Sequence, residues 1–301
     1  MRAIVNDRSA RTGRRISLFE NLEQRRLMST TLVNGILTVT GTAGNDRLEA
    51  DMLNGEVYVF ENGLLGGGFG GIFPAANVTK VVFQGLDGHD TMIAHPELAK
   101  PSDFWGGNGD DSMYGNIQPN YMYGAAGRDY MWAEGGNDSL AGGDGNDLIY
   151  AGYGNDLVSG YEGDDLIFGG VGNDTIYGDV GHDTILGEDG ADWIRADSGW
   201  DLVYGGNHND TIYGGWDNDR LYGEAGNDWI SGEDGNDTIT GGAGNDSMYG
   251  GNHDDFFEAF DNTWDLIDGG AGTDRAHCDK RPWWDRWQVQ DSLYSIESSY
   301  E

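Results

Sequence analysis

Aspartate recurs at every ninth position through the second half of the chain. Between residues 111 and 255 this step visits 17 positions, of which sixteen are Asp and one is Asn120. The sixteen are Asp111, Asp129, Asp138, Asp147, Asp156, Asp165, Asp174, Asp183, Asp192, Asp201, Asp210, Asp219, Asp228, Asp237, Asp246 and Asp255. Hard cations such as Ca²⁺ prefer oxygen ligands, and Ca²⁺ takes about six to eight of them. The spacing therefore predicts a row of cation sites rather than a single site.

Each of these positions belongs to a nonapeptide of the form Gly-x-x-Gly-x-Asp-x-apolar-x. The residue two places after the Asp is apolar in all 17 units, and the residue five places before it is Gly in 14. The residue two places before it is Gly in 13, and the departures are Gln118, His208, Asp217 and His253. Glycine-rich positions favour turns, whereas the last three residues of the unit fit a short strand.

This pattern predicts an all-β fold, a parallel β-roll (β-solenoid) in which two nonapeptides, about 18 residues, make one coil. Each unit supplies one loop and one strand, and strands of successive coils lie about 4.8 Å apart. The apolar eighth positions of the two resulting sheets meet in a thin core that no single repeat could bury alone. The loop Asp residues then form two columns, one beginning at Asp111 and the other at Asn120.

The charge of the chain favours bound cations. Asp and Glu total 52 against 17 Lys and Arg, which gives a formal net charge of −35 at pH 7. Stacked carboxylates repel one another unless a cation lies between them, and the departures from the pattern reduce the expected number of calcium ions to on the order of ten. The same charge argues against nucleic acid as a partner. No run reaches the roughly 18 apolar residues of a membrane span.

The repeat resembles the RTX, or haemolysin-type, calcium-binding nonapeptide, whose pattern GGxGxDxUx is matched by GGDGNDLIY at residues 142–150 and GGAGNDSMY at residues 241–249. That resemblance implies a calcium-binding parallel β-roll in which the sixth-position Asp residues of successive coils share ions with loop carbonyls. It makes metal ligands of the sixteen Asp residues above and of Asp274, which ends the last loop, GGAGTD, at residues 269–274.

The flanks continue the repeat less regularly. Residues 31–105 are expected to form degenerate β repeats that extend the stack of residues 106–258. Their loops end at Asp46 and Asp90, and each of these two residues is either a calcium ligand or a plain turn residue. The frame slips by one after Asp255, since Asp265 follows ten residues later. Residues 259–301 are expected to hold the last loop and an aromatic cap containing Trp283, Trp284 and Trp287, with a sugar-stacking site as the alternative.

Residues 1–30 read as a sorting or export segment. FENLEQRRLMS, residues 19–29, is similar to the LEPR-XLL segment of bacterial surface proteins, with Gln24 in place of the Pro and Met28 in place of one Leu. This similarity and the calcium array together indicate a secreted or cell-surface protein.

The sequence favours a structural or adhesive protein over an enzyme. Cys278 is the single cysteine, and no HExxH, GxSxG or CxxC motif is present. The alternative is a non-catalytic module or stand-alone relative of an exported RTX enzyme such as a protease, lipase or alginate epimerase. Outward ninth positions form aromatic rows, such as Tyr150, Phe168, Tyr204 and Tyr222. These rows fit either ladders that stabilise the strands or a surface for a glycan or for self-association.

Overall fold

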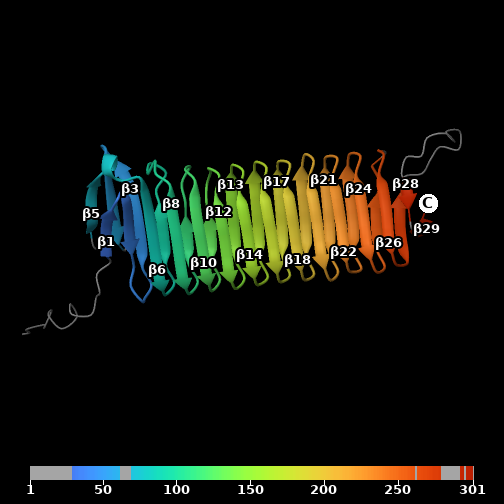
Figure 1. Ribbon diagram of the computed structural model, residues 1–301, viewed down its shortest axis with the longest axis horizontal. Helices are drawn as coiled ribbons and strands as arrows, with labels where there is room; N and C mark the ends of the chain where they lie inside the picture. Colours follow the sequence, from blue (N-terminus) through green and yellow to red (C-terminus); the bar gives the residue numbers. More distant parts are fainter. Residues whose placement is uncertain (1–28, 62–68, 262, 279–291, 295, 301) are drawn as a thin grey trace, which may run out of the picture.

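The computed structural model describes residues 29–61, 69–261, 263–278, 292–294 and 296–300. Within these residues the chain forms two long β-sheets and one 3₁₀ turn, η1 (Ala75–Asn77). Figure 1 shows the strands stacked side by side along one axis, with the loops on the two long edges of the stack. No described helix is long and apolar enough to cross a membrane. The expected export segment falls almost wholly outside the described residues.

From β5 (Phe69–Pro74) onward the strands alternate between the two sheets along the chain, so each sheet takes one strand from every coil. In spatial order the first sheet contains β1 (Ser29–Val33), β2 (Ile36–Thr40), β6 (Lys80–Asp87), β8 (Ser102–Asn108), β10 (Asn120–Ala126), β12 (Ser139–Asp144), β14 (Leu157–Glu162), β16 (Thr175–Val180), β18 (Trp193–Ser198), β20 (Thr211–Trp216), β22 (Trp229–Asp234), β24 (Ser247–Asn252), β26 (Leu266–Ala271) and β28 (Ser292–Tyr294).

The second sheet is described from the C-terminal end of the roll to the N-terminal end. It contains β29 (Ile296–Tyr300), β27 (Asp274–Cys278), β25 (Phe256–Ala259), β23 (Thr238–Ala243), β21 (Arg220–Ala225), β19 (Leu202–Asn207), β17 (Thr184–Asp189), β15 (Leu166–Val171), β13 (Leu148–Tyr153), β11 (Tyr130–Trp132), β9 (Ser112–Tyr114), β7 (Thr91–Ala94), β3 (Arg47–Leu53), β4 (Glu56–Glu61) and β5 (Phe69–Pro74).

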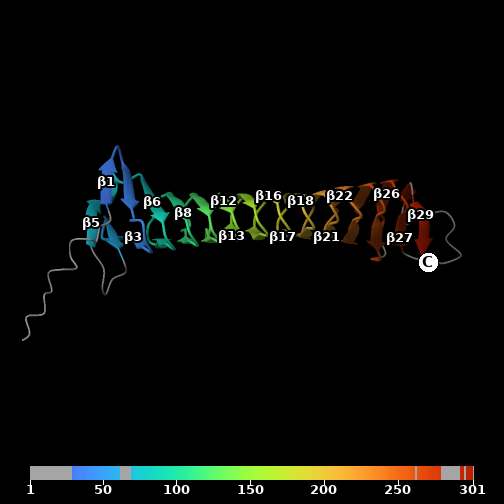
Figure 2. The same ribbon diagram turned by 90° about the horizontal axis from the view of Figure 1, so that it is seen from below.

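The register of the parallel pairs confirms the predicted β-roll with 18 residues per coil. Leu140 in β12 pairs with Val158 in β14, and Ile149 in β13 pairs with Ile167 in β15. The slip after Asp255 is visible between β24 and β26, where Met248 pairs with Ile267, 19 residues further on. The predicted eighth positions form the core, and each of them from Met113 to Phe257 is buried. Figure 2 shows the two sheets facing each other across this core.

The N-terminal end of the stack departs from the parallel pattern. β1 pairs antiparallel with β2, and β3, β4 and β5 form a second antiparallel set. The turns between these strands contain Asn34-Gly35 and Asn54-Gly55, all four residues with positive φ. At the other end, β28 and β29 continue the stack in parallel. The expected aromatic cap of Trp283, Trp284 and Trp287 lies outside the described residues.

Glycine is required where successive loops approach most closely. Gly145 has φ +127°, and a Cβ on it would lie 1.9 Å from the carbonyl oxygen of Gly127, one coil earlier. A contact that short with backbone cannot be relieved by a side-chain rotation, and the positive φ adds strain of about 1–3 kcal/mol for other residues. At Gly145, the spacing of the coils therefore leaves no room for a side chain.

The aromatic rows on the two outer faces form ladders. The rings of Tyr150 and Phe168 stack with centroids 4.5 Å apart, and those of Tyr204 and Tyr222 with centroids 4.9 Å apart. On the first sheet, the ring of Tyr213, a ninth-position residue, lies with its centroid 4.8 Å from that of Trp229, a seventh-position residue. Because rings packed in this way bury part of one another's surface, these residues stabilise neighbouring strands.

Candidate metal centre

The predicted loop Asp residues lie in two buried columns, one on each long edge of the roll. The backbone N–H of each Asp donates a hydrogen bond to Oδ1 of the Asp one coil further along, as from Asp129 to Asp147 at 2.7 Å. The first column contains Asp46, Asp90, Asp111, Asp129, Asp147, Asp165, Asp183, Asp201, Asp219, Asp237, Asp255 and Asp274. The second contains Asn120, Asp138, Asp156, Asp174, Asp192, Asp210, Asp228, Asp246 and Asp265. All 17 Asp residues predicted as ligands lie in these columns.

The second carboxylate oxygen, Oδ2, is buried without a hydrogen-bond donor in all sixteen repeat Asp residues from Asp111 to Asp255. A charged oxygen buried in this way has lost its water and gained nothing, which costs at least about 1–3 kcal/mol, the figure for an unsatisfied neutral group. Native proteins pair such charges or bind metals with them. The same feature repeated at every loop points to a common partner that is a cation.

Backbone carbonyl oxygens approach the same point as Oδ2. A Cβ built on Gly142 would lie 2.2 Å from Oδ2 of Asp147 and 2.7 Å from the carbonyl oxygen of Gly160, which belongs to the following coil. Both oxygens therefore lie beside the point where a first-position side chain would begin, and 14 of the 17 units carry Gly there. Three loops carry Ala at this first position, at residues 133, 151 and 196.

Asn120 shows what this cluster of carbonyls accepts when the loop residue is uncharged. Its Nδ2 donates to the carbonyl oxygens of Asn116 at 2.9 Å, Gln118 at 2.5 Å and Ala133 at 3.3 Å. These carbonyls occupy the second and fourth positions of its own loop and the first position of the next coil. The amide nitrogen thus satisfies carbonyls that, in the other loops, surround an anionic oxygen. A positively charged group is what an Asp loop lacks.

Burial perturbs the acidity of the loop carboxylates. It raises the pKa of Asp129 to about 6, of Asp147 to about 8 and of Asp219 to about 9, in each case because the charged form is removed from water. The backbone N–H donated to Oδ1 lowers each pKa, and for Asp147 and Asp219 the carboxylates of adjacent coils raise it further. In the absence of a cation, ionised loops therefore oppose folding at neutral pH.

The donor set suits calcium. It consists of carboxylate and carbonyl oxygens without nitrogen or sulfur, which is the preference of hard cations, and Ca²⁺ tolerates irregular shells better than Mg²⁺ does. Among the described residues, no group of three or more Asp, Glu, His or Cys side chains is placed to hold one metal ion. Each loop instead brings one carboxylate to several carbonyls, so most of the candidate ligands are backbone atoms.

The structure distinguishes the two loops that the sequence left open. Oδ2 of Asp46 accepts hydrogen bonds from the backbone and hydroxyl of Thr42, as expected of a turn residue. Oδ2 of Asp90 is buried without a donor, as in the repeats. Asp265, which the nine-residue step from Asp111 does not reach, joins the second column after Asp246. Its nine-residue distance from Asp274 was the signal for it.

The comparison with known families agrees with this geometry. A family model described as RTX calcium-binding nonapeptide repeat (4 copies) matches residues 105–140, 141–176, 177–212, 195–230 and 231–259. These segments together span the regular part of the roll, from within β8 to the end of β25, and more than half of the chain. No curated protein matched the chain.

Proposed function

Because the chain belongs to the RTX calcium-binding nonapeptide repeat family, we propose that it is a secreted protein whose folding is driven by calcium and whose role at the cell surface is structural or adhesive. The chain is a calcium-binding β-roll. The observation that carries the proposal is the buried, donorless Oδ2 at sixteen successive loops. Calcium supplies the positive charge that lets these carboxylates stay ionised inside the fold.

The proposed ligands are the predicted Asp residues of the two columns and the carbonyls beside them. For Asp147, the carbonyls equivalent to those around the amide of Asn120 belong to Gly143, Gly145 and Gly160. Asp274 joins the set because it continues the first column from Asp255. Asp90 and Asp265 are added to it because they lie in the same columns.

Replacing Asn120 with Asp should raise the number of bound calcium ions. The substitution puts a carboxylate among carbonyls that now receive the amide hydrogens, next to Asp138, whose Oδ1 already accepts the Asn120 backbone N–H at 2.7 Å. Calcium counted by equilibrium dialysis on the N120D and wild-type chains measures the difference, and we expect one more ion in the variant. Equal counts in two folded proteins would show that the loop carboxylates are not the ligands.

A location outside the cell is consistent with the calcium affinity expected of such sites. Proteins with these repeats are typically secreted, and calcium sites that work extracellularly have dissociation constants of roughly 10⁻⁴–10⁻³ M. Protease treatment of intact source cells, with the medium assayed separately, tests the location. We expect the chain on the accessible surface or in the medium; a chain found entirely within intact cells would contradict the proposal.

A further inference from the structure

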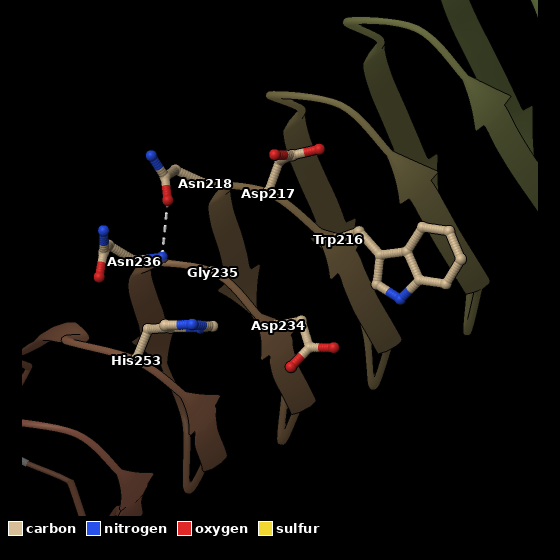
Figure 3. A pocket seen from close by; sticks show the side chains of 7 residues that line it. All are labelled: Trp216, Asp217, Asn218, Asp234, Gly235, Asn236 and His253. Carbon is tan, nitrogen blue, oxygen red and sulfur yellow. Dashed lines mark hydrogen bonds between the residues drawn. The ribbon is translucent and has the colours of Figure 1, made fainter.

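A hollow of about 460 Å³ lies on the edge of the roll that carries the first Asp column. Trp216, Asp217 and Asn218 come from one coil, Asp234, Gly235 and Asn236 from the next, and His253 from the third. Figure 3 shows these residues on three successive loops, with the indole of Trp216 on one side and Asn218, Asn236 and His253 on the other. The volume lies within the range of about 300–1,000 Å³ that is usual for small-molecule sites.

Two of the lining residues depart from the consensus of the repeat. Asp217 and His253 occupy the fourth position, which is Gly in 13 of the 17 units. Both keep the left-handed backbone of that position, with φ of 76° and 83°. This conformation is strained for any residue that carries a side chain. His208 shows the same conformation on the opposite edge, outside the hollow.

Trp216 presents an open ring face. Its side chain is 64% exposed, and it makes no ring contact with any described residue, in contrast to the stacked rows on the two sheets. A flat, apolar ring face of this kind is suited to the C–H face of a sugar ring.

The polar groups of the hollow include both donors and acceptors. Oδ1 of Asn218 accepts from the backbone of Asn236, and Oδ1 of Asn236 accepts from the backbone of Asp254, so each amide NH₂ is left to donate. Nδ1 of His253 lies 3.0 Å from the carbonyl oxygen of Asn252, which can only accept, so Nε2 of the neutral ring is an acceptor.

The two carboxylates complete the acceptor set. Asp217 has no hydrogen-bond or salt-bridge partner among the described residues, and Asp234 uses one oxygen for the amide of Asn252. Sugar hydroxyls both donate and accept, so they match a mixture of this kind, whereas a simple cation would need acceptors alone. Carboxylates in a chain of net charge −35 repel uronic and sulfated sugars.

We propose that this hollow binds an oligosaccharide that carries no acidic group. The apolar face of one pyranose lies on Trp216, and hydroxyls of the ligand meet Asp217, Asp234, His253 and the two Asn amides. A second hollow of about 200 Å³, lined in part by Arg195, Asp197 and Ser198, shares Trp216 as a wall. The two hollows flank one indole, so the ligand class is an oligosaccharide rather than a single sugar. This oligosaccharide would be the ligand of the adhesive function proposed above, and the inference rests on that function.

The test is binding of neutral oligosaccharides to the full chain in saturating calcium. Cellohexaose, mannohexaose and chitohexaose are titrated by calorimetry, with hexagalacturonate as the acidic comparison. We expect at least one neutral probe to bind and hexagalacturonate not to bind. W216A should weaken that binding at least tenfold. W200A should leave it unchanged, because Trp200 is similarly exposed, at 63%, on a neighbouring coil but does not line either hollow.

Glycine substitutions separate binding from folding. D217G and H253G should stabilise the roll, because they relieve the left-handed strain, and should still weaken sugar binding severalfold. H208G should stabilise the roll and leave binding unchanged. Circular dichroism of each sample in calcium reports whether the roll is folded. A folded wild-type roll that binds none of the neutral probes, or W216A binding as wild type, overturns this inference and leaves the calcium proposal standing.

Discussion

Replacing Asp147 with Asn should have opposite effects on stability with and without calcium. In calcium, we expect the free energy of unfolding of the variant to fall by on the order of 3 kcal/mol, because the bound ion loses its carboxylate partner. In chelator, we expect it to gain about 1–3 kcal/mol, because it removes a buried, donorless anion. The new amide can donate to the loop carbonyls as that of Asn120 does, and Oδ1 can still accept from the backbone of Asp129.

Urea unfolding measures both effects, with trimethylamine N-oxide added to the chelated samples to favour the compact state. D144N is the matched control: Asp144 lies in the same unit but is exposed, so the same change of charge should shift either stability by less than about 0.5 kcal/mol. If Asp147 were a structural residue that only accepts the Asp129 hydrogen bond, D147N would change the free energy of unfolding in the same direction in calcium and in chelator.

The metal-free roll should be more stable in acid than at neutral pH. The loop Asp residues have a pKa of 3.8 when exposed, and burial raises it to about 6 in Asp129, about 8 in Asp147 and about 9 in Asp219. The folded chain therefore holds these protons more tightly than the unfolded chain. The resulting stabilisation is complete below about pH 4 and is lost as the pH rises through about 6 to 9.

The size of this effect decides whether the metal-free roll can fold. One unit of pKa shift corresponds to about 1.4 kcal/mol, so the shift of Asp129 from 3.8 to about 6 is by itself a sizeable part of a domain's usual stability of roughly 5–15 kcal/mol, and raised pKa values recur along both columns. Circular dichroism of dialysed, metal-free protein from about pH 4 to about pH 9 measures it. We expect strand content to fall across this range and calcium to restore it at neutral pH. Strand content that rises with pH in metal-free protein would contradict the burial of these groups.

The regular half of the fold is predictable because each repeat restates the same local rules. The nine-residue step located the loop Asp residues, and apolar eighth positions such as Ile149 and Ile167 face inward in register, one coil apart. The antiparallel strands at the N-terminus were not predicted. Their signal was present in Asn34-Gly35 and Asn54-Gly55, since Asn-Gly favours the two-residue turns of antiparallel hairpins.

The electrostatics of the loops could not be read from the sequence. The pattern marks Asn120 only as an exception, whereas in the fold its amide nitrogen lies within hydrogen-bond distance of three carbonyl oxygens. The stacking of the coils decides that Oδ1 of each repeat Asp accepts a hydrogen bond and that Oδ2 does not. The hollow beside Trp216 is likewise a product of stacking, since it joins residues from three successive coils.

Far-UV circular dichroism of the full chain at neutral pH, first in chelator and then titrated separately with calcium and with magnesium, tests most directly whether calcium drives folding. We predict little strand signal in chelator and a cooperative transition to β structure at roughly 10⁻⁴–10⁻³ M calcium, with magnesium much less effective because it demands a tighter, more regular shell. A chain that is already fully folded in chelator, and whose spectrum does not respond to calcium, would contradict the account.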